Sequence, residues 1–168
     1  MKKYSLTRES KVTLFGVTVF RIKAEISFSN ILAGDLGGWI EKESNLSQIG
    51  NAWVGGDAWV GGNAWVGGNA WVGGNAWVEG NALVGGNARV EDDASLFYIS
   101  KIGSRRGNTT IFRLKVGIGV SCGCFYGTLK EFEMKVKKSY PNKKNIHRQE
   151  YDLIIKLARV KFKSKGSK

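Results

Sequence analysis

Proline, cysteine and histidine are all scarce in this sequence. The 168 residues include one proline, two cysteines and one histidine. The cysteines, Cys122 and Cys124, are too few and too close together for the disulfide framework of a small secreted domain. Because proline is scarce while glycine is abundant, at 23 residues, the composition indicates a regularly patterned backbone rather than a disordered chain.

Long apolar runs are also missing. No run approaches the length needed to cross a bilayer. The first residues, MKKYSLTRES, contain two lysines but no apolar stretch after them, so they do not resemble a secretion signal. We therefore expect a protein that does not enter a membrane and that works in the cytoplasm.

The positive charge is concentrated near the C-terminus. The whole chain carries +12, but residues 97–168 hold 18 basic and 4 acidic residues, giving +14. Residues 51–96 carry −4 and residues 1–50 carry +2. A segment this basic attracts phosphates or an acidic protein face, and the same charge also serves solubility alone.

The middle of the chain is a six-residue repeat. From Asn51 it reads NAWVGG, DAWVGG, NAWVGG, NAWVGG, NAWVEG, NALVGG, NARVED, DASLFY. Alanine recurs every sixth residue from Ala52 to Ala94, and valine does so from Val54 to Val90. Strand side chains alternate with a period of two, so each A-W-V tripeptide predicts a short strand with Ala and Val inward and Trp outward. The G-G-N tripeptide predicts a bend, in which Gly and Asn accommodate positive φ.

This pattern, Val-Gly-x-x-Ala-x, resembles the hexapeptide repeat of left-handed parallel β-helices. The resemblance implies three hexads per coil, with residues 18 apart stacked on each other. The preceding residues 34–51 keep the register loosely, with Ile40 and Leu46 on the alanine row. They also resemble the corresponding segment of uncharacterised phage and prophage hexapeptide-repeat proteins.

The predicted fold is therefore mainly β, with three parts. Residues 1–38 are expected to form a β-hairpin that caps a left-handed parallel β-helix over 39–97. Residues 98–168 are expected to form a small basic α+β module. Its first helix begins at the capping box of Thr128 and Glu131, and its second helix spans about 148–160. The motif GSRRGNTTIF…VSCGCFYGTLKEFE resembles a C-terminal module of the same phage-type proteins.

The outward tryptophans are the first candidate binding residues. The three-hexad coil would stack each on the residue 18 positions later, and together they exceed the apolar surface that a monomer normally exposes. Three alternatives could shield these side chains from solvent. They are self-association, which in the resembling family usually gives a trimer; the chain's own terminal segments; or a ligand such as a sugar, a base or a cation. These residues are Trp53, Trp59, Trp65, Trp71 and Trp77.

Basic residues of the C-terminal part are the second candidate set. They would form a phosphate-binding face interleaved with Phe125, Tyr126 and Tyr140, or simply a solvated surface. No recognised nucleic-acid motif accompanies them. The residues are Arg105, Arg106, Lys137, Lys138, Lys143, Lys144 and Arg148.

The sequence offers little for catalysis. Cys122 and Cys124 are expected on one strand, facing the core, and with His147 they do not make a recognised zinc site. The resembling family includes acyltransferases with a histidine on the β-helix and carbonic anhydrase relatives with three zinc-binding histidines. Residues 51–96 contain no histidine. We therefore expect no cofactor, no metal and no catalytic residue, with an acyltransferase that uses His147 as the remaining enzymatic alternative.

The resemblance and the charge together suggest a function. We expect a non-catalytic phage- or prophage-type binding or scaffold protein that self-associates through the β-helix, with a trimer favoured. Its basic module would bind an acidic protein of the host cytoplasm, for example to block or sequester a defence component. The alternatives are nucleic-acid or nucleotide binding through the basic module, and a hexapeptide acyltransferase.

Overall fold

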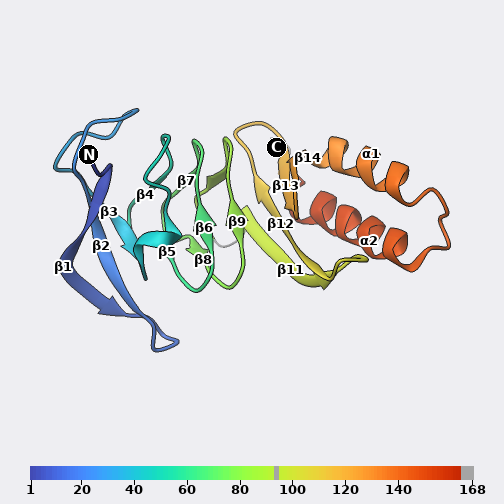
Figure 1. Cartoon of the computed structure of the whole chain (residues 1–168), viewed down its shortest axis with the longest axis horizontal. Coiled ribbons are helices and arrows are strands. Elements are labelled where there is room, and N and C mark those ends of the chain that lie inside the picture. The colour runs from blue at the N-terminus through green and yellow to red at the C-terminus, as the bar shows by residue number, and fades with distance from the viewer. Residues whose placement is uncertain (93–94, 164–168) are drawn as a thin grey trace, which may run out of the picture.

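A computed structural model describes residues 1–92 and 95–163. The fold is built mainly of strands and ends in two helices. Figure 1 shows its parts in chain order along one long axis: an N-terminal hairpin, the repeat, an antiparallel sheet and the helix pair. Ala94 of the alanine row, and Lys165 and Lys168 of the basic segment 97–168, lie outside the described residues. In the described residues, no helix has the length and apolar composition needed to span a membrane.

The N-terminal hairpin consists of β1 (Tyr4–Val12) and β2 (Thr18–Ala24), which pair antiparallel. Strand β2 pairs antiparallel with β3 (Leu36–Ile40), and β3 pairs in parallel with the repeat strand β5. An antiparallel hairpin is thus present within residues 1–38, where the sequence predicts one. Through β3 it covers the first backbone edge of the repeat.

The repeat forms very short parallel strands. Each pairs with the strand 18 residues away: β4 with β7 and then β10, β5 with β8, and β6 with β9. For example, Trp53 N donates to Ala70 O at 3.0 Å. The predicted pairing of residues 18 apart is confirmed. The strands are β4 (Trp53–Val54), β5 (Trp59–Val60), β6 (Trp65–Val66), β7 (Trp71–Val72), β8 (Trp77–Val78), β9 (Leu83–Val84) and β10 (Arg89–Val90).

Alanine and valine fill the inside of the repeat, as the alternation predicts. Every described residue of the two rows between Ala52 and Val90 is at most 1% exposed.

The residues that adopt positive φ in the bends differ from the expectation. Positive φ occurs at the second glycine of each pair, for instance 62° at Gly56 and 65° at Gly68, and not at the asparagines. The bends therefore do not need asparagine for its backbone conformation, because glycine alone provides the positive φ. The asparagine side chains remain available for other contacts.

The segment before the repeat is out of the expected register. Ile40 pairs with Val60 and Leu46 with Val66, each 20 residues on, so Ile40 and Leu46 lie on the valine row and not the alanine row. Two extra residues between Leu46 and Val54 cause this shift. The short helix η1 (Glu43–Asn45) lies in this segment. The buried Asn45 side chain donates to Ala64 O at 2.8 Å and so helps to hold the irregular segment against the repeat.

The C-terminal part is an antiparallel sheet covered by two helices. Its strands pair in chain order: β11 (Leu96–Ile102), β12 (Gly107–Arg113), β13 (Ile118–Cys122) and β14 (Phe125–Thr128). Helix α1 (Leu129–Ser139) begins with the predicted capping box at Thr128. Helix α2 (Ile146–Lys161) begins two residues earlier than expected, because the Asn145 side chain accepts bonds from the backbone N–H groups of His147 and Arg148.

The C-terminal sheet closes the far end of the repeat. Leu83 N, at the last coil, donates to Thr110 Oγ1 at 3.1 Å, and the Tyr126 hydroxyl donates to Gly85 O at 2.8 Å. Phe112 of β12 belongs to the same apolar core as the alanine and valine rows. Direct bonds and shared packing therefore join the repeat to the sheet that carries the helices.

Candidate functional site

The N-terminal segment buries the first tryptophan. Trp53 is only 2% exposed, which corrects the expectation that it faces solvent. The ring of Phe28 packs edge-on against it at 5.5 Å. The Cζ2 atom of Trp53 also lies only 2.6 Å from the position that a Cβ on Gly37 would take. Of the three expected covers, the chain's own terminal segment accounts for this residue.

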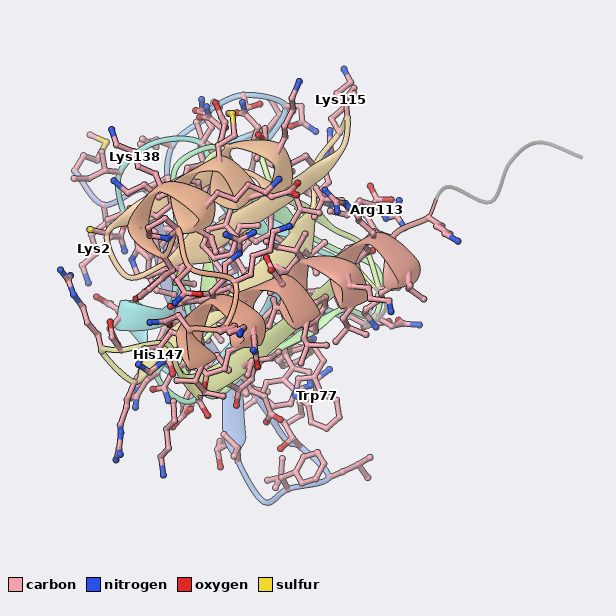
Figure 2. The ribbon with its side chains drawn as sticks, turned by 90° about the vertical axis from the view of Figure 1, so that its right-hand side faces the viewer. Lys2, Trp77, Arg113, Lys115, Lys138 and His147 are labelled. Carbon is pink, nitrogen blue, oxygen red and sulfur yellow. The ribbon has the colours of Figure 1, made fainter. Side chains whose placement is uncertain are left out.

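The hairpin also covers part of a second tryptophan face. Trp59 and Trp77 are half-buried, with ring centroids 4.9 Å apart. Phe15, in the turn between β1 and β2, approaches Trp77 to 4.7 Å. Figure 2 shows Trp77 beside the loop of this hairpin. This pair is therefore partly shielded from solvent and from ligands.

The other two tryptophans differ from each other in exposure. Trp71 is half-buried, and the guanidinium of Arg89 lies 5.9 Å from its ring centroid. Trp65 is 38% exposed, and Leu83, which pairs with it, is 41% exposed. The Trp65–Leu83 face is thus the outward wall of the repeat that the rest of the chain covers least.

Two basic segments meet at the helix end of the molecule. Arg105 and Arg106 are exposed in the turn between β11 and β12, and Lys143 and Lys144 are exposed between α1 and α2. Ser104 and Tyr140 join the two segments, with their hydroxyl oxygens 2.8 Å apart. The structure therefore brings these four predicted residues to the same end of the molecule.

The remaining predicted basic residues behave differently from one another. Lys138 is exposed at the end of α1, whereas Lys137 Nζ pairs with Glu133 at 2.8 Å. Arg148 is only 6% exposed. Its Nε donates to Asp152 at 2.9 Å and its Nη1 to Tyr140 O at 3.1 Å. Arg148, expected on the binding face, is instead a buried structural residue that holds the end of α1 against α2.

All four Asp and Glu side chains of residues 97–168 are engaged within this part of the chain. Glu131 accepts from Thr128, Glu133 pairs with Lys137 and Arg159, Glu150 pairs with His147, and Asp152 pairs with Arg148. The bond from Lys137 lowers the pKa of Glu133, and the bond from His147 lowers that of Glu150. Among the described residues, no carboxylate pairs with Arg105, Arg106, Lys143 or Lys144.

The aromatic residues of this part are used in packing. Phe125 contacts Phe132 at 5.3 Å between centroids, and Tyr126 stacks on Phe112 at 6.0 Å. Tyr140 lies 5.9 Å from His147. Tyr126 is nevertheless exposed, so the expected interleaving of these aromatic residues with the cations stays a prediction.

The cysteines do not share a strand face. Cys122 ends β13 and accepts a bond from Thr109 Oγ1 at 3.1 Å, with the Tyr151 hydroxyl 3.7 Å away. Burial, and then the neighbouring Cys122, raises the pKa of Tyr151. Cys124 lies in the turn after β13 and is exposed, which corrects the expectation of a core position; Gly123 makes this turn with φ 58°. Across residues 1–92 and 95–163, no group of three or more His, Cys, Asp or Glu side chains is placed to hold a metal ion.

His147 does not approach the repeat. Its Nδ1 lies 3.0 Å from Glu150 Oε2, one turn later in α2. The same carboxylate oxygen accepts from Gly103 N at 3.1 Å. The imidazole is thus fixed at the helix end of the molecule, next to the β11–β12 turn.

Comparison with known proteins gives a partial similarity. No known protein-family model matches the chain. The chain is similar to the uncharacterized acetyltransferase YdcK of Escherichia coli (strain K12), with 36% identity over 61 residues. The aligned part covers 32% of this chain and 19% of that protein. The similarity therefore concerns a limited part of both chains.

Proposed function

We propose that this chain is a non-catalytic binding protein. In this proposal the repeat is a left-handed parallel β-helix that acts as a rigid scaffold, and the basic end captures an anionic macromolecule. One observation supports it most directly: four exposed cations from two segments lie at one end, while every Asp and Glu side chain of the C-terminal part is engaged with other partners.

Charge explains why such an end would bind. The C-terminal residues 97–168 carry +14 against −4 for residues 51–96, so the molecule is strongly polarised along its sequence. Clustered cations attract a polyanion over roughly 10 Å at moderate salt and accelerate its association. Capture of a host component, such as part of a defence pathway, is the form of this function that the resemblance to phage repeat proteins suggests.

The first test is the salt dependence of binding. A fluorescent 20-mer oligonucleotide and a fluorescent poly-glutamate peptide would each be titrated by anisotropy at 50–300 mM NaCl. We expect affinity for at least one of them to fall steeply with salt, because released counterions drive the association. Absence of binding at 50 mM, or affinity that does not change with salt, would contradict the proposal.

A matched pair of variants locates the binding surface. Arg105→Glu reverses a charge at the basic end, and Arg8→Glu makes the same change on exposed Arg8 of the N-terminal hairpin. We expect Arg105→Glu to weaken binding roughly five- to tenfold and Arg8→Glu to leave it nearly unchanged, because screening limits the effect of the distant charge. Equal effects of the two variants would place the binding surface elsewhere.

A hexapeptide acyltransferase is the second candidate, and the partial similarity to an acetyltransferase favours it. In this candidate His147 would serve as general base, oriented by Glu150 at 3.0 Å. The test is release of free thiol from acetyl-CoA in the presence of mixed amine and hydroxyl acceptors. Thiol release by the native chain that is lost in His147→Ala would support the acyltransferase. If the native chain and His147→Ala both release thiol only at the rate seen without protein, the acyltransferase candidate is excluded.

A further inference from the structure

A groove on the outside of the repeat is lined by amides, an indole and two cations. Its volume is about 330 Å³. The repeat, the N-terminal segment and the turn after β12 all contribute to it. The residues that the argument uses are Asn51, Asn69, Asn87, Trp71, Arg89 and Lys115. Figure 2 labels Lys115 on the side of the molecule opposite to Lys138 and His147, so this groove is separate from the basic end.

The three asparagines form an oriented ladder. Because residues 18 apart pair, Asn51 Nδ2 donates to Asn69 Oδ1 at 3.1 Å, and Asn69 Nδ2 donates to Asn87 Oδ1 at 3.3 Å. The amide N–H₂ of Asn87 ends the ladder and has no protein acceptor among the described residues. All three asparagines are exposed. The ladder thus presents a free hydrogen-bond donor at the end formed by Asn87.

Two cations lie at that same end of the ladder. Arg89 follows Asn87 by two residues, and Lys115 lines the groove from the turn after β12. In the part of the chain that the structure describes, no carboxylate side chain lines the groove. A guanidinium, an ammonium and a free amide N–H₂ together match a group with several anionic oxygens, and phosphate is such a group.

Trp71 supplies a flat apolar contact beside these donors. It is half-buried, with the Arg89 guanidinium 5.9 Å from its ring centroid. Sugar rings and bases pack on indoles in this way. A polar, partly apolar hollow of this size is large enough for a small ligand.

We propose that this groove binds a sugar phosphate, either free or as part of a nucleotide. The phosphate is held by Arg89, Lys115 and the Asn87 amide, and the sugar ring lies over Trp71 and the asparagine ladder. This site does not depend on the function proposed for the basic end, because it uses different residues.

The repeat itself supplies a matched control for the test. A second ladder joins Asn63 to Asn81 at 3.3 Å, at another corner of the repeat and outside the groove. Asp57 already occupies the equivalent position of another hexad, so aspartate is compatible with the local fold. Asn69→Asp therefore adds a negative charge inside the groove, and Asn63→Asp adds the same charge outside it.

Isothermal titration with glucose 6-phosphate, adenosine monophosphate and glucose tests the proposal on the full chain. We expect a phosphorylated probe to bind and glucose to bind at least tenfold more weakly. Asn69→Asp and Lys115→Gln should each weaken the phosphorylated probe about tenfold, while Asn63→Asp should not. Tighter binding of adenosine monophosphate than of glucose 6-phosphate would identify the nucleotide as the source, and the reverse would identify the free sugar phosphate.

Three outcomes overturn the proposal. The first is no binding of either phosphorylated probe at 10 mM. The second is equal binding of glucose. The third is equal loss in Asn69→Asp and Asn63→Asp, which would mean that net charge and not the groove governs binding.

Discussion

At the scale of single residues, three glycines that follow a valine in the repeat leave room for the tryptophan two positions before them; they are Gly61, Gly67 and Gly73. The ring of Trp59 lies over Gly61, where a built Cβ would be 2.8 Å from Cζ3 of the indole. The glycines at 67 and 73 stand in the same relation to Trp65 and Trp71. In W-V-G, the first and third residues share a strand face. Because glycine has no side chain at the third position, the indole at the first position can pack flat against the outer wall of the repeat.

Lys3 is a buried lysine at the start of the chain. It is 3% exposed, its Nζ donates to Ala52 O at 2.9 Å, and burial lowers its pKa from 10.5 to about 8. The folded protein therefore releases this proton near pH 8, while the unfolded chain keeps it until about pH 10.5. Over that interval the unfolded state binds more protons, so stability contributed by Lys3 rises with pH.

A comparison with Lys3→Met tests this pH dependence. Between pH 7 and 9.5, unfolding free energy of the native chain should increase relative to Lys3→Met by on the order of 1 kcal/mol. The measurement is urea denaturation at several pH values, kept below pH 10. Above pH 10 Tyr4 complicates the comparison, because burial raises its pKa and favours the protonated folded form. Parallel pH profiles of the two proteins would contradict the assignment.

At the scale of elements, β3 determines how the hairpin meets the repeat. It lies so close to the first coil that a Cβ on Gly38 would be 2.6 Å from Ala58 O and 2.9 Å from Val54 Cγ1. Both atoms are fixed, one in a backbone carbonyl and the other in the buried valine row. The close approach of two backbones thus requires glycine in the middle of this strand.

Gly38→Ala should therefore destabilise the protein by roughly 2–3 kcal/mol, the cost of forcing extra volume into a packed core. Gly85→Ala is the control, because a Cβ there meets Tyr126 at an ordinary 3.6 Å. Thermal unfolding followed by circular dichroism would compare the two variants. If both lower the melting temperature equally, the close contact of β3 with the repeat is not the cause.

The elements that the sequence predicts best are those with a strict local signal. The six-residue period predicts the strands, the buried rows and the 18-residue pairing, and the Thr128 capping box predicts the start of α1. Errors occur where the period breaks. Two additional residues after Leu46 move Ile40 and Leu46 to the valine row, and nothing in the local sequence indicates which side of the register they join.

The candidate site was less predictable, because it depends on contacts between distant segments. The basic residues were identified by charge, but burial of Arg148 depends on Asp152 and Tyr140, which only the folded helix pair brings to it. Alternation predicts Trp53 on the outside, because it describes the strand alone and not the Phe28 ring that covers the indole. The six-residue pattern does not reveal the asparagine ladder, because it places asparagine in the bend, where glycine in fact provides the positive φ.

For the whole molecule, the Trp65–Leu83 face bears on self-association. It is the least covered wall of the repeat, and an exposed apolar wall of this kind favours contact between copies. We expect the native chain to self-associate through it, with a trimer as the expected state. The domain limits at residues 38 and 97 likewise remain predictions.

Leu83→Arg tests this interface without disturbing the repeat. Arg89 occupies the same outward position of the next hexad, so arginine is compatible with the fold. Size-exclusion chromatography with light scattering should show an oligomer for the native chain and for Leu83→Met, and a monomer for Leu83→Arg. A monomeric native chain would mean that this face has no partner of its own kind.

The pairing of residues 18 apart also governs how such a chain can grow. Adding one 18-residue unit would give every strand a new neighbour of the same kind and lengthen the stack by about 4.8 Å. Adding a single hexad would shift each later strand to a different stack and so turn the helix-bearing end to face another direction. Evolution can therefore change the span between the two ends in steps of three hexads, while their relative orientation is preserved.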